Sequence, residues 1–167
     1  VLLEQTTTVL TSHLRRWDRR LRLAQSVLWA PRGAIVGLII GLLVSTVART
    51  RPWILPGQMA LITVIATILT TAAVLAWVWF WPQSTERLAR YFDRRFGLKE
   101  RVSTALEVSA GVIPLPDRLI EYQLEDATRA VQKVNPITLL PVRVRTREMI
   151  VLLVLIGLAA YMLLAPN

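Results

Sequence analysis

The sequence predicts an all-α integral membrane protein with three transmembrane helices, an N-terminal amphipathic helix and a small cytoplasmic helical segment between spans two and three. Hydrophobic residues make up 54% of the 167 residues, the mean hydropathy is +0.48 and the net charge is +9. The apolar residues are concentrated in three blocks that contain no charged residue, and basic residues flank these blocks. Average soluble domains are less apolar and do not concentrate their apolar residues in this way.

The first uncharged block covers residues 33–48 and predicts transmembrane helix 1 at 31–48. Its length corresponds to about 24 Å of α-helix, which is shorter than the roughly 30 Å hydrocarbon core of a bilayer. We therefore expect the helix to begin near Pro31 or earlier, with the Arg32 side chain reaching the headgroups.

Two further blocks predict the other spans. Residues 57–81 form transmembrane helix 2, which Pro56 and Pro82 bracket, and a short outer loop at 49–56 precedes it. Residues 148–165 form transmembrane helix 3, because no charged residue follows Glu148. A buried core helix of a soluble protein is the alternative for the two shorter blocks, but their uncharged length and flanking interfacial residues favour the membrane.

The distribution of Lys and Arg predicts the orientation of the chain. Residues 1–32 carry six of the 20 basic residues, residues 82–147 carry twelve, and the loop at 49–56 carries two. Three spans place residues 1–32 and 82–147 on one side, which then holds 18 of the 20. Because cytoplasmic loops are rich in Lys and Arg, we expect a cytoplasmic N-terminus and an extracytoplasmic C-terminus.

Residues 1–30 are expected to form a cytoplasmic amphipathic helix. Leu10, Leu14, Trp17 and Leu21 recur at steps of four and three, which is the spacing of one helix face. Arginines surround Trp17, so we expect this helix to lie on the anionic inner leaflet with its apolar face in lipid. Docking on a partner protein is the alternative.

The cytoplasmic segment 82–147 is expected to contain three helices, at 83–96, 98–109 and 116–134, followed by an extended stretch at 137–144. Ser84 or Thr85 is the expected N-cap of the first helix, and Gly97 interrupts the pattern. The third helix has an apolar face through Ile120, Leu124 and Val131, which we also expect to lie against the membrane.

A stripe of small residues in the first span predicts close helix packing. Gly33, Gly37, Gly41 and Ser45 recur at every fourth position, and such a stripe lets two helix backbones approach each other. The second span offers a matching stripe through Ala60, Thr63, Thr67 and Thr70 or Thr71. We expect spans one and two to pack through these stripes, and packing against another chain is the alternative.

No residue pattern predicts catalysis, a metal or a cofactor. The chain has no cysteine, its one histidine, His13, lies outside the expected spans, and the span cores hold no charged residue. The positive charge flanks apolar blocks, so we assign it to anionic lipid rather than to nucleic acid. Membrane lipids and other membrane-protein subunits are the expected partners.

Residues 87–107, RLARYFDRRFGLKERVSTALE, carry a family resemblance. The run is similar to a segment of uncharacterised bacterial membrane proteins that are described as domains of unknown function. In those proteins two spans precede the pattern A-R-x-x-D-R-R-x-G-L-x-[ED]-R-x-x-T-A-L-E, and a third span leads into a large extracytoplasmic region. The resemblance implies a bacterial plasma-membrane protein, either a shorter relative or the first portion of one, and it implies no activity.

These observations favour a non-catalytic membrane anchor or scaffold subunit that presents a basic helical surface to the cytoplasm. The candidate docking residues lie at the corner between the first two cytoplasmic helices: Asp93, Arg94, Arg95, Glu100 and Arg101. An accessory subunit of a respiratory or photosynthetic complex is one alternative. A transporter component is another.

Overall fold

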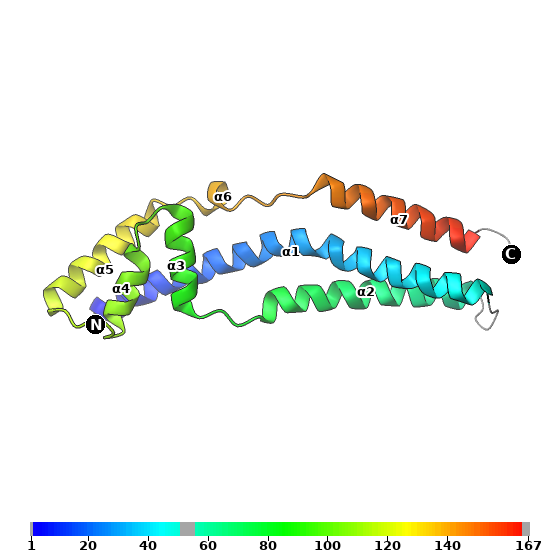
Figure 1. Cartoon of the computed structure of the whole chain (residues 1–167). Coiled ribbons are helices and arrows are strands. Elements are labelled where there is room, and N and C mark those ends of the chain that lie inside the picture. The colour runs from blue at the N-terminus through cyan, green and yellow to red at the C-terminus, as the bar shows by residue number, and fades with distance from the viewer. Residues whose placement is uncertain (1, 51–55, 165–167) are drawn as a thin grey trace. The chain divides into compact units, whose positions relative to one another are not determined.

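The computed structural model describes residues 2–50 and 56–164, and every regular element in these residues is a helix (Figure 1). The all-α expectation is therefore confirmed. The chain divides into two compact units. Unit 1 comprises Val1–Arg22 and Pro82–Pro141, and unit 2 comprises Leu23–Trp81 and Val142–Asn167.

Helix α1, Leu2–Thr50, contributes residues to both units and continues through Pro31. The helix therefore begins well before Pro31, and the expected amphipathic helix and the expected span at 31–48 are parts of this one continuous helix. A proline inside a helix removes one backbone hydrogen bond and crowds the preceding turn. Ala24 and Gly33 are buried on either side of it, so packing can hold the helix together across this weak point.

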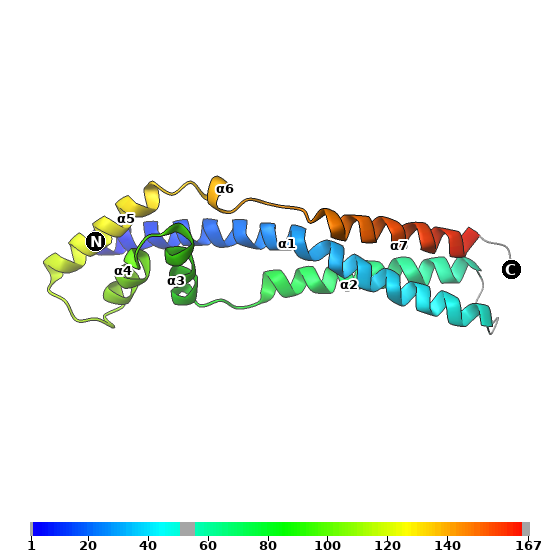
Figure 2. The same ribbon diagram turned by 45° about the horizontal axis from the view of Figure 1, so that its top comes forward.

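Unit 1 is built from the N-terminal part of α1 and four further helices. These are α3 (Thr85–Phe96), α4 (Arg101–Ser109), α5 (Asp117–Gln132) and the short α6 (Pro136–Leu139). Both views show α3, α4 and α5 gathered beside the N-terminal part of α1 (Figures 1 and 2). The rings of Phe92 and Phe96 lie edge-on to the Trp17 indole, with centroids 5.3 and 4.8 Å away, at the centre of the unit's hydrophobic core.

The two apolar stripes that were expected to face lipid face this core instead. Leu14 and Trp17 are each 1% exposed, and they pack with Leu124 and Val131 of α5, which are buried as well. An amphipathic pattern shows that a helix has an apolar neighbour, but it does not identify that neighbour. Here α3, α4 and α5 supply it, so the lipid-facing interpretation of both stripes is wrong.

The helix ends of unit 1 follow local sequence signals with two exceptions. Ser84 caps α3 by accepting a hydrogen bond from the Arg87 backbone nitrogen. However, α4 begins at Arg101 rather than at residue 98, because the intervening backbone forms a turn. The stretch 137–144, expected to be extended, begins inside α6, whose first turn is capped by the Asn135 side chain bonding to the Ile137 nitrogen.

Unit 2 contains the rest of α1 together with α2 (Pro56–Phe80) and α7 (Thr146–Leu164). Two helical stretches, Thr6–Ala48 and Gly57–Phe80, are long and apolar enough to cross a membrane. Many large apolar side chains of this unit are exposed, such as Leu43 and Leu69 at 63% each. Residues 51–55 of the expected outer loop, 49–56, lie outside the described residues.

Candidate functional site

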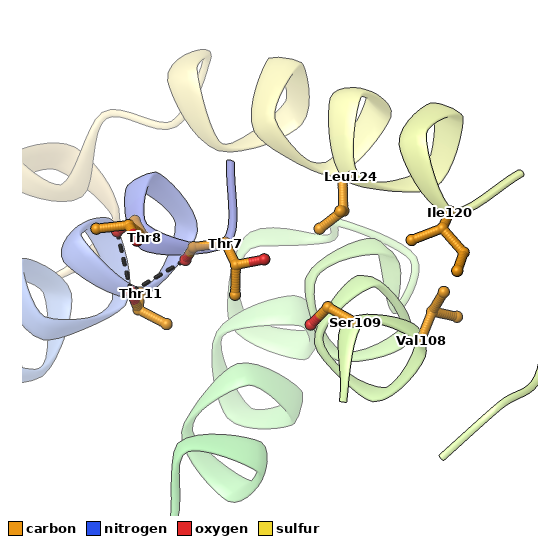
Figure 3. A pocket seen from close by; sticks show the side chains of 7 residues that line it. All are labelled: Thr7, Thr8, Thr11, Val108, Ser109, Ile120 and Leu124. Carbon is orange, nitrogen blue, oxygen red and sulfur yellow. Dashed lines mark hydrogen bonds between the residues drawn. The ribbon is translucent and has the colours of Figure 1, made fainter. Parts of the chain in front are cut away.

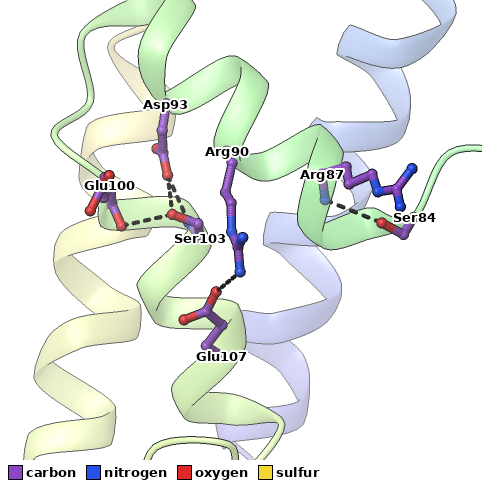
Figure 4. A network of polar contacts seen from close by, with 7 residues as sticks. All are labelled: Ser84, Arg87, Arg90, Asp93, Glu100, Ser103 and Glu107. Carbon is purple, nitrogen blue, oxygen red and sulfur yellow. Dashed lines mark hydrogen bonds and ion pairs between the residues drawn. The ribbon is translucent and has the colours of Figure 1, made fainter.

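The corner between α3 and α4 is organised around the buried carboxylate of Asp93, which is 2% exposed (Figure 4). Its Oδ1 atom accepts a hydrogen bond from the Val102 backbone nitrogen at 3.2 Å. Its Oδ2 atom accepts from the Ser103 nitrogen at 2.8 Å and from the Ser103 hydroxyl at 2.7 Å. The first amides of a helix have no partner within it and favour a negative charge. Asp93 of α3 therefore caps α4.

The turn before α4 explains why the cap comes from another helix. Gly97 ends α3 in a left-handed conformation, with φ at 66°, and both Gly97 and Leu98 donate their backbone N–H to the Asp93 carbonyl. Glu100 occupies the N-cap position of α4 with φ at 60°, and its side chain makes no capping bond. The Asp93 side chain fills the role that Glu100 leaves open.

A second polar contact ties the same two helices at the surface. The Arg90 guanidinium lies 2.8 Å from the Glu107 carboxylate, and Figure 4 shows the two side chains pointing toward each other. The hydrogen bond from Arg90 to Glu107 raises the pKa of Arg90, and the charge of Glu107 acts in the same direction. The pair is exposed, so its contribution to stability is small. Asp93 and the Arg90–Glu107 pair both belong to the 87–107 run, so this run forms a structural corner.

The five candidate docking residues have different environments. Asp93 is buried and occupied by three hydrogen bonds, so its assignment to a docking surface is wrong. Arg94, Arg95 and Glu100 are exposed. Arg101 is exposed as well, and its Nε atom lies 3.3 Å from the Asp126 carboxylate. Sequence reasoning missed Ser103, whose signal was a hydroxyl residue in the first turn of a helix.

Exposed arginines characterise the outer surface of unit 1. Arg15, Arg16 and Arg19 of α1 are exposed, as are Arg94 and Arg95 of α3, and in the described part of the chain none of them forms an ion pair. Arg22, by contrast, pairs with Asp18 at 2.8 Å. A group of unpaired guanidiniums is available for anions or for an acidic protein surface.

Within unit 2 the glycine stripe of α1 lies against α2, and these two helices run side by side in both views (Figures 1 and 2). A Cβ atom added at Gly33 would lie 2.8 Å from the Thr71 Cα atom. One added at Gly37 would lie 2.8 Å from the Thr67 nitrogen, and one at Gly41 would lie 2.7 Å from the Thr63 Cβ atom. The backbones are so close that no side chain fits between them.

Polar and small side chains complete this contact. The Thr70 hydroxyl donates a hydrogen bond to the Gly33 carbonyl oxygen at 2.8 Å, which joins the two helices directly. Ser45 and Thr63 are both buried. Inside one chain the structure thus brings the predicted packing residues Gly37 and Gly41 against Thr67 and Thr63, and Gly33 against Thr71. The sixth predicted residue, Ser45, is buried.

Arg32, at the start of the uncharged block of α1, bonds to α7 within unit 2. Its guanidinium lies 2.8 Å from the Glu148 carboxylate and 4.6 Å from the centre of the Trp29 ring. Arg145 approaches the same carboxylate at 3.5 Å. The sequence suggested only that Arg32 would reach the headgroups, and the structure adds a specific acidic partner for it.

A hollow of about 610 Å³ lies in unit 1 between α1, α4 and α5 (Figure 3). Four hydroxyl residues, Thr7, Thr8, Thr11 and Ser109, share its lining with Val108, Ile120 and Leu124. The Thr11 hydroxyl donates to backbone carbonyls of its own helix, and none of the described residues that line the hollow is charged. Across residues 2–50 and 56–164, no three His, Cys, Asp or Glu side chains are grouped to hold a metal ion.

No protein-family model, curated protein or solved structure matches the chain.

Proposed function

We propose that this chain is a non-catalytic membrane anchor or scaffold subunit that presents a basic helical domain, unit 1, to partner proteins at the cytoplasmic face of a bacterial plasma membrane. The observation that carries the proposal is the contrast between the units. Unit 1 buries its apolar stripes in its own core and leaves unpaired arginines outside. Unit 2 leaves large apolar side chains exposed along its helices.

The membrane part of the proposal comprises three spans, in α1, α2 and α7. Support for the third comes from the sequence of α7, which has no charged residue after Glu148. The exposed apolar side chains of α7, including Leu153, Val154 and Tyr161, suit lipid better than water. The cytoplasmic placement of unit 1 rests on the positive-inside distribution of Lys and Arg.

The docking part of the proposal centres on Arg94 and Arg95. Both are exposed at the end of α3 and neither forms an ion pair in the described region, so their guanidiniums are available to carboxylates of a partner. Removing an exposed charged side chain from an interface weakens binding mainly because the charges of the two partners no longer match. The surface next to the α3–α4 corner is therefore the expected docking face.

Mild-detergent purification followed by mass spectrometry tests this function. The double variant Arg94→Gln/Arg95→Gln should lose co-purifying proteins that the unaltered chain retains. The control, Arg87→Gln/Arg118→Gln, removes the same charge from other exposed positions of unit 1 and should retain them. Retention of every co-purifying protein by the Arg94/Arg95 variant would contradict docking at this corner.

A further inference from the structure

A second hollow of unit 1, of about 440 Å³, lies between the α3–α4 turn, the C-terminal end of α5 and α6. Lys99, Arg101 and Lys133 line it, and none of its described lining residues is acidic. Two of the cations, Lys99 and Arg101, lie together at the start of α4, and the third, Lys133, is the C-cap of α5, which is distant in the sequence. Folding therefore assembles a positively charged groove that no single stretch of the sequence predicts.

Uncharged donors and an apolar wall complete the groove. Asn135 lines it and uses its Oδ1 atom to cap α6, so its amide nitrogen is the group it can offer a ligand. Thr138 contributes a hydroxyl, and Leu98 and Val134 are among the apolar lining residues. Arg101 contacts Asp126 through Nε at 3.3 Å, which leaves its two terminal nitrogens for another acceptor.

The backbone at the rim is held in an unfavourable conformation. Lys99 and Glu100 have φ values of 54° and 60°, and they are the only residues other than glycine with positive φ in the described part of the chain. Side chains with a Cβ atom rarely adopt this region, and such residues are concentrated at binding sites. Lys99 therefore lines the groove from a strained turn, two residues before Arg101.

We propose that this groove binds a phosphate group, carried either by an anionic phospholipid or by a small soluble compound. Lys99 and Lys133, together with Arg101 that also pairs with Asp126, supply positive charge for a phosphate, and arginine and amide donors match its oxygens. The apolar wall favours a ligand that has an apolar part next to the phosphate. The proposal concerns a different site from the Arg94/Arg95 docking surface, because neither of those residues lines the groove.

Native mass spectrometry of the full chain in neutral detergent, titrated with phosphatidylglycerol, tests the lipid source. The groove variant Lys99→Gln/Arg101→Gln/Lys133→Gln should need at least about tenfold more lipid for half occupancy, because each basic residue adds to the attraction of anionic lipid. The control Arg87→Gln/Arg118→Gln/Arg129→Gln removes the same charge from exposed positions outside the groove and should bind like the unaltered chain.

Calorimetry with glycerol 3-phosphate and with inorganic phosphate tests the soluble source on the same three proteins. If the groove variant alone loses saturable binding of these soluble probes, and all three proteins bind lipid equally, the groove binds a soluble phosphate compound. If the groove and control variants bind both probes equally, the groove is not a phosphate site. Circular dichroism checks folding, and the single variant Lys133→Gln replaces the triple variant if the latter unfolds.

Discussion

At Asp93 a carboxylate has been taken out of water and placed where three donors converge. Burial of a charge is costly unless it is hydrogen-bonded, and here two backbone amides and one hydroxyl satisfy it. Those amides belong to the first turn of α4, whose positive dipole end also favours a carboxylate. The residue therefore stabilises α4 and joins it to α3 at the same time.

Removal of this carboxylate should loosen α4 selectively. We expect Asp93→Ala to lower the free energy of unfolding by about 2–3 kcal/mol, because it removes a helix cap and charge-assisted hydrogen bonds. Ser103→Ala should cost about 1 kcal/mol, since it removes one donor. Hydrogen exchange at the Val102 and Ser103 amides measures the effect directly.

The neighbouring exposed residue provides the control for this change. Arg94→Ala should alter stability by no more than about 0.5 kcal/mol, as for other surface substitutions. Equal exchange rates in the Asp93→Ala and Arg94→Ala proteins would show that the Asp93 carboxylate does not cap α4.

Among the elements, α1 packs in two different ways along its length. Its N-terminal part inserts Leu14 and Trp17 between α3 and α5, as in the core of a soluble protein. Further along, its glycines allow α2 to pack closely against it, as in helix pairs that associate in lipid. Each part can be tested with a matched pair of substitutions.

The N-terminal part should behave as core. Leu14→Ala should lower the free energy of unfolding of unit 1 by roughly 2–5 kcal/mol, the usual cost of emptying a buried leucine site. Leu23→Ala on the same helix should cost less than about 1 kcal/mol, because Leu23 is half exposed. Limited proteolysis across residues 110–116 reports the opening of unit 1. Similar cleavage of both variants would indicate that the Leu14 side chain is not part of a core.

The glycine stripe should tolerate no added side chain. Gly37→Ala and Gly37→Leu force α1 and α2 apart and should cost about 1–3 kcal/mol, the range for overpacking. Gly157→Ala in α7 is the control, because nothing lies within 4 Å of its added Cβ atom. Denaturant titration in detergent compares the three proteins. A Gly37→Leu protein that unfolds like the unaltered chain would place the stripe against lipid.

For the whole molecule, the proposed topology divides the exposed polar positions between two sides of the membrane. The chain contains no cysteine, so a single introduced thiol can be labelled against a clean background. Gln83 lies just before α3 in unit 1, and Gln58 lies at the start of α2 in unit 2. Both positions are exposed.

Thiol labelling of intact cells checks this topology. The Gln58→Cys protein should react with a membrane-impermeant maleimide, and the Gln83→Cys protein should react only after the cells are opened, because 18 of the 20 basic residues are expected on the cytoplasmic side. Labelling of Gln83→Cys in intact cells would reverse the orientation and move unit 1 outside the cell.

The sequence by itself determined the features that depend on local chemistry. Helical periodicity predicted an all-α chain, Ser84 and Thr85 were the two expected caps of α3, of which Ser84 is the cap, and Gly97 indicated where α3 ends. The four-residue spacing of small residues pointed to the face of α1 that approaches α2. These signals are local because caps, glycine turns and small-residue stripes act over one or two helical turns.

Only the tertiary structure decided what covers each apolar face and where each charge lies. The periodicity of Leu14 and Trp17 is the same whether lipid or α3 and α5 lie against it. Aspartate is usually a surface residue. Asp93 is nevertheless buried, because the Val102 and Ser103 amides of α4, which have no partner within their helix, bond to its carboxylate. The groove of Lys99, Arg101 and Lys133 exists only after folding. Burial depends on contacts between distant segments, and such contacts leave no periodic signal in a single sequence.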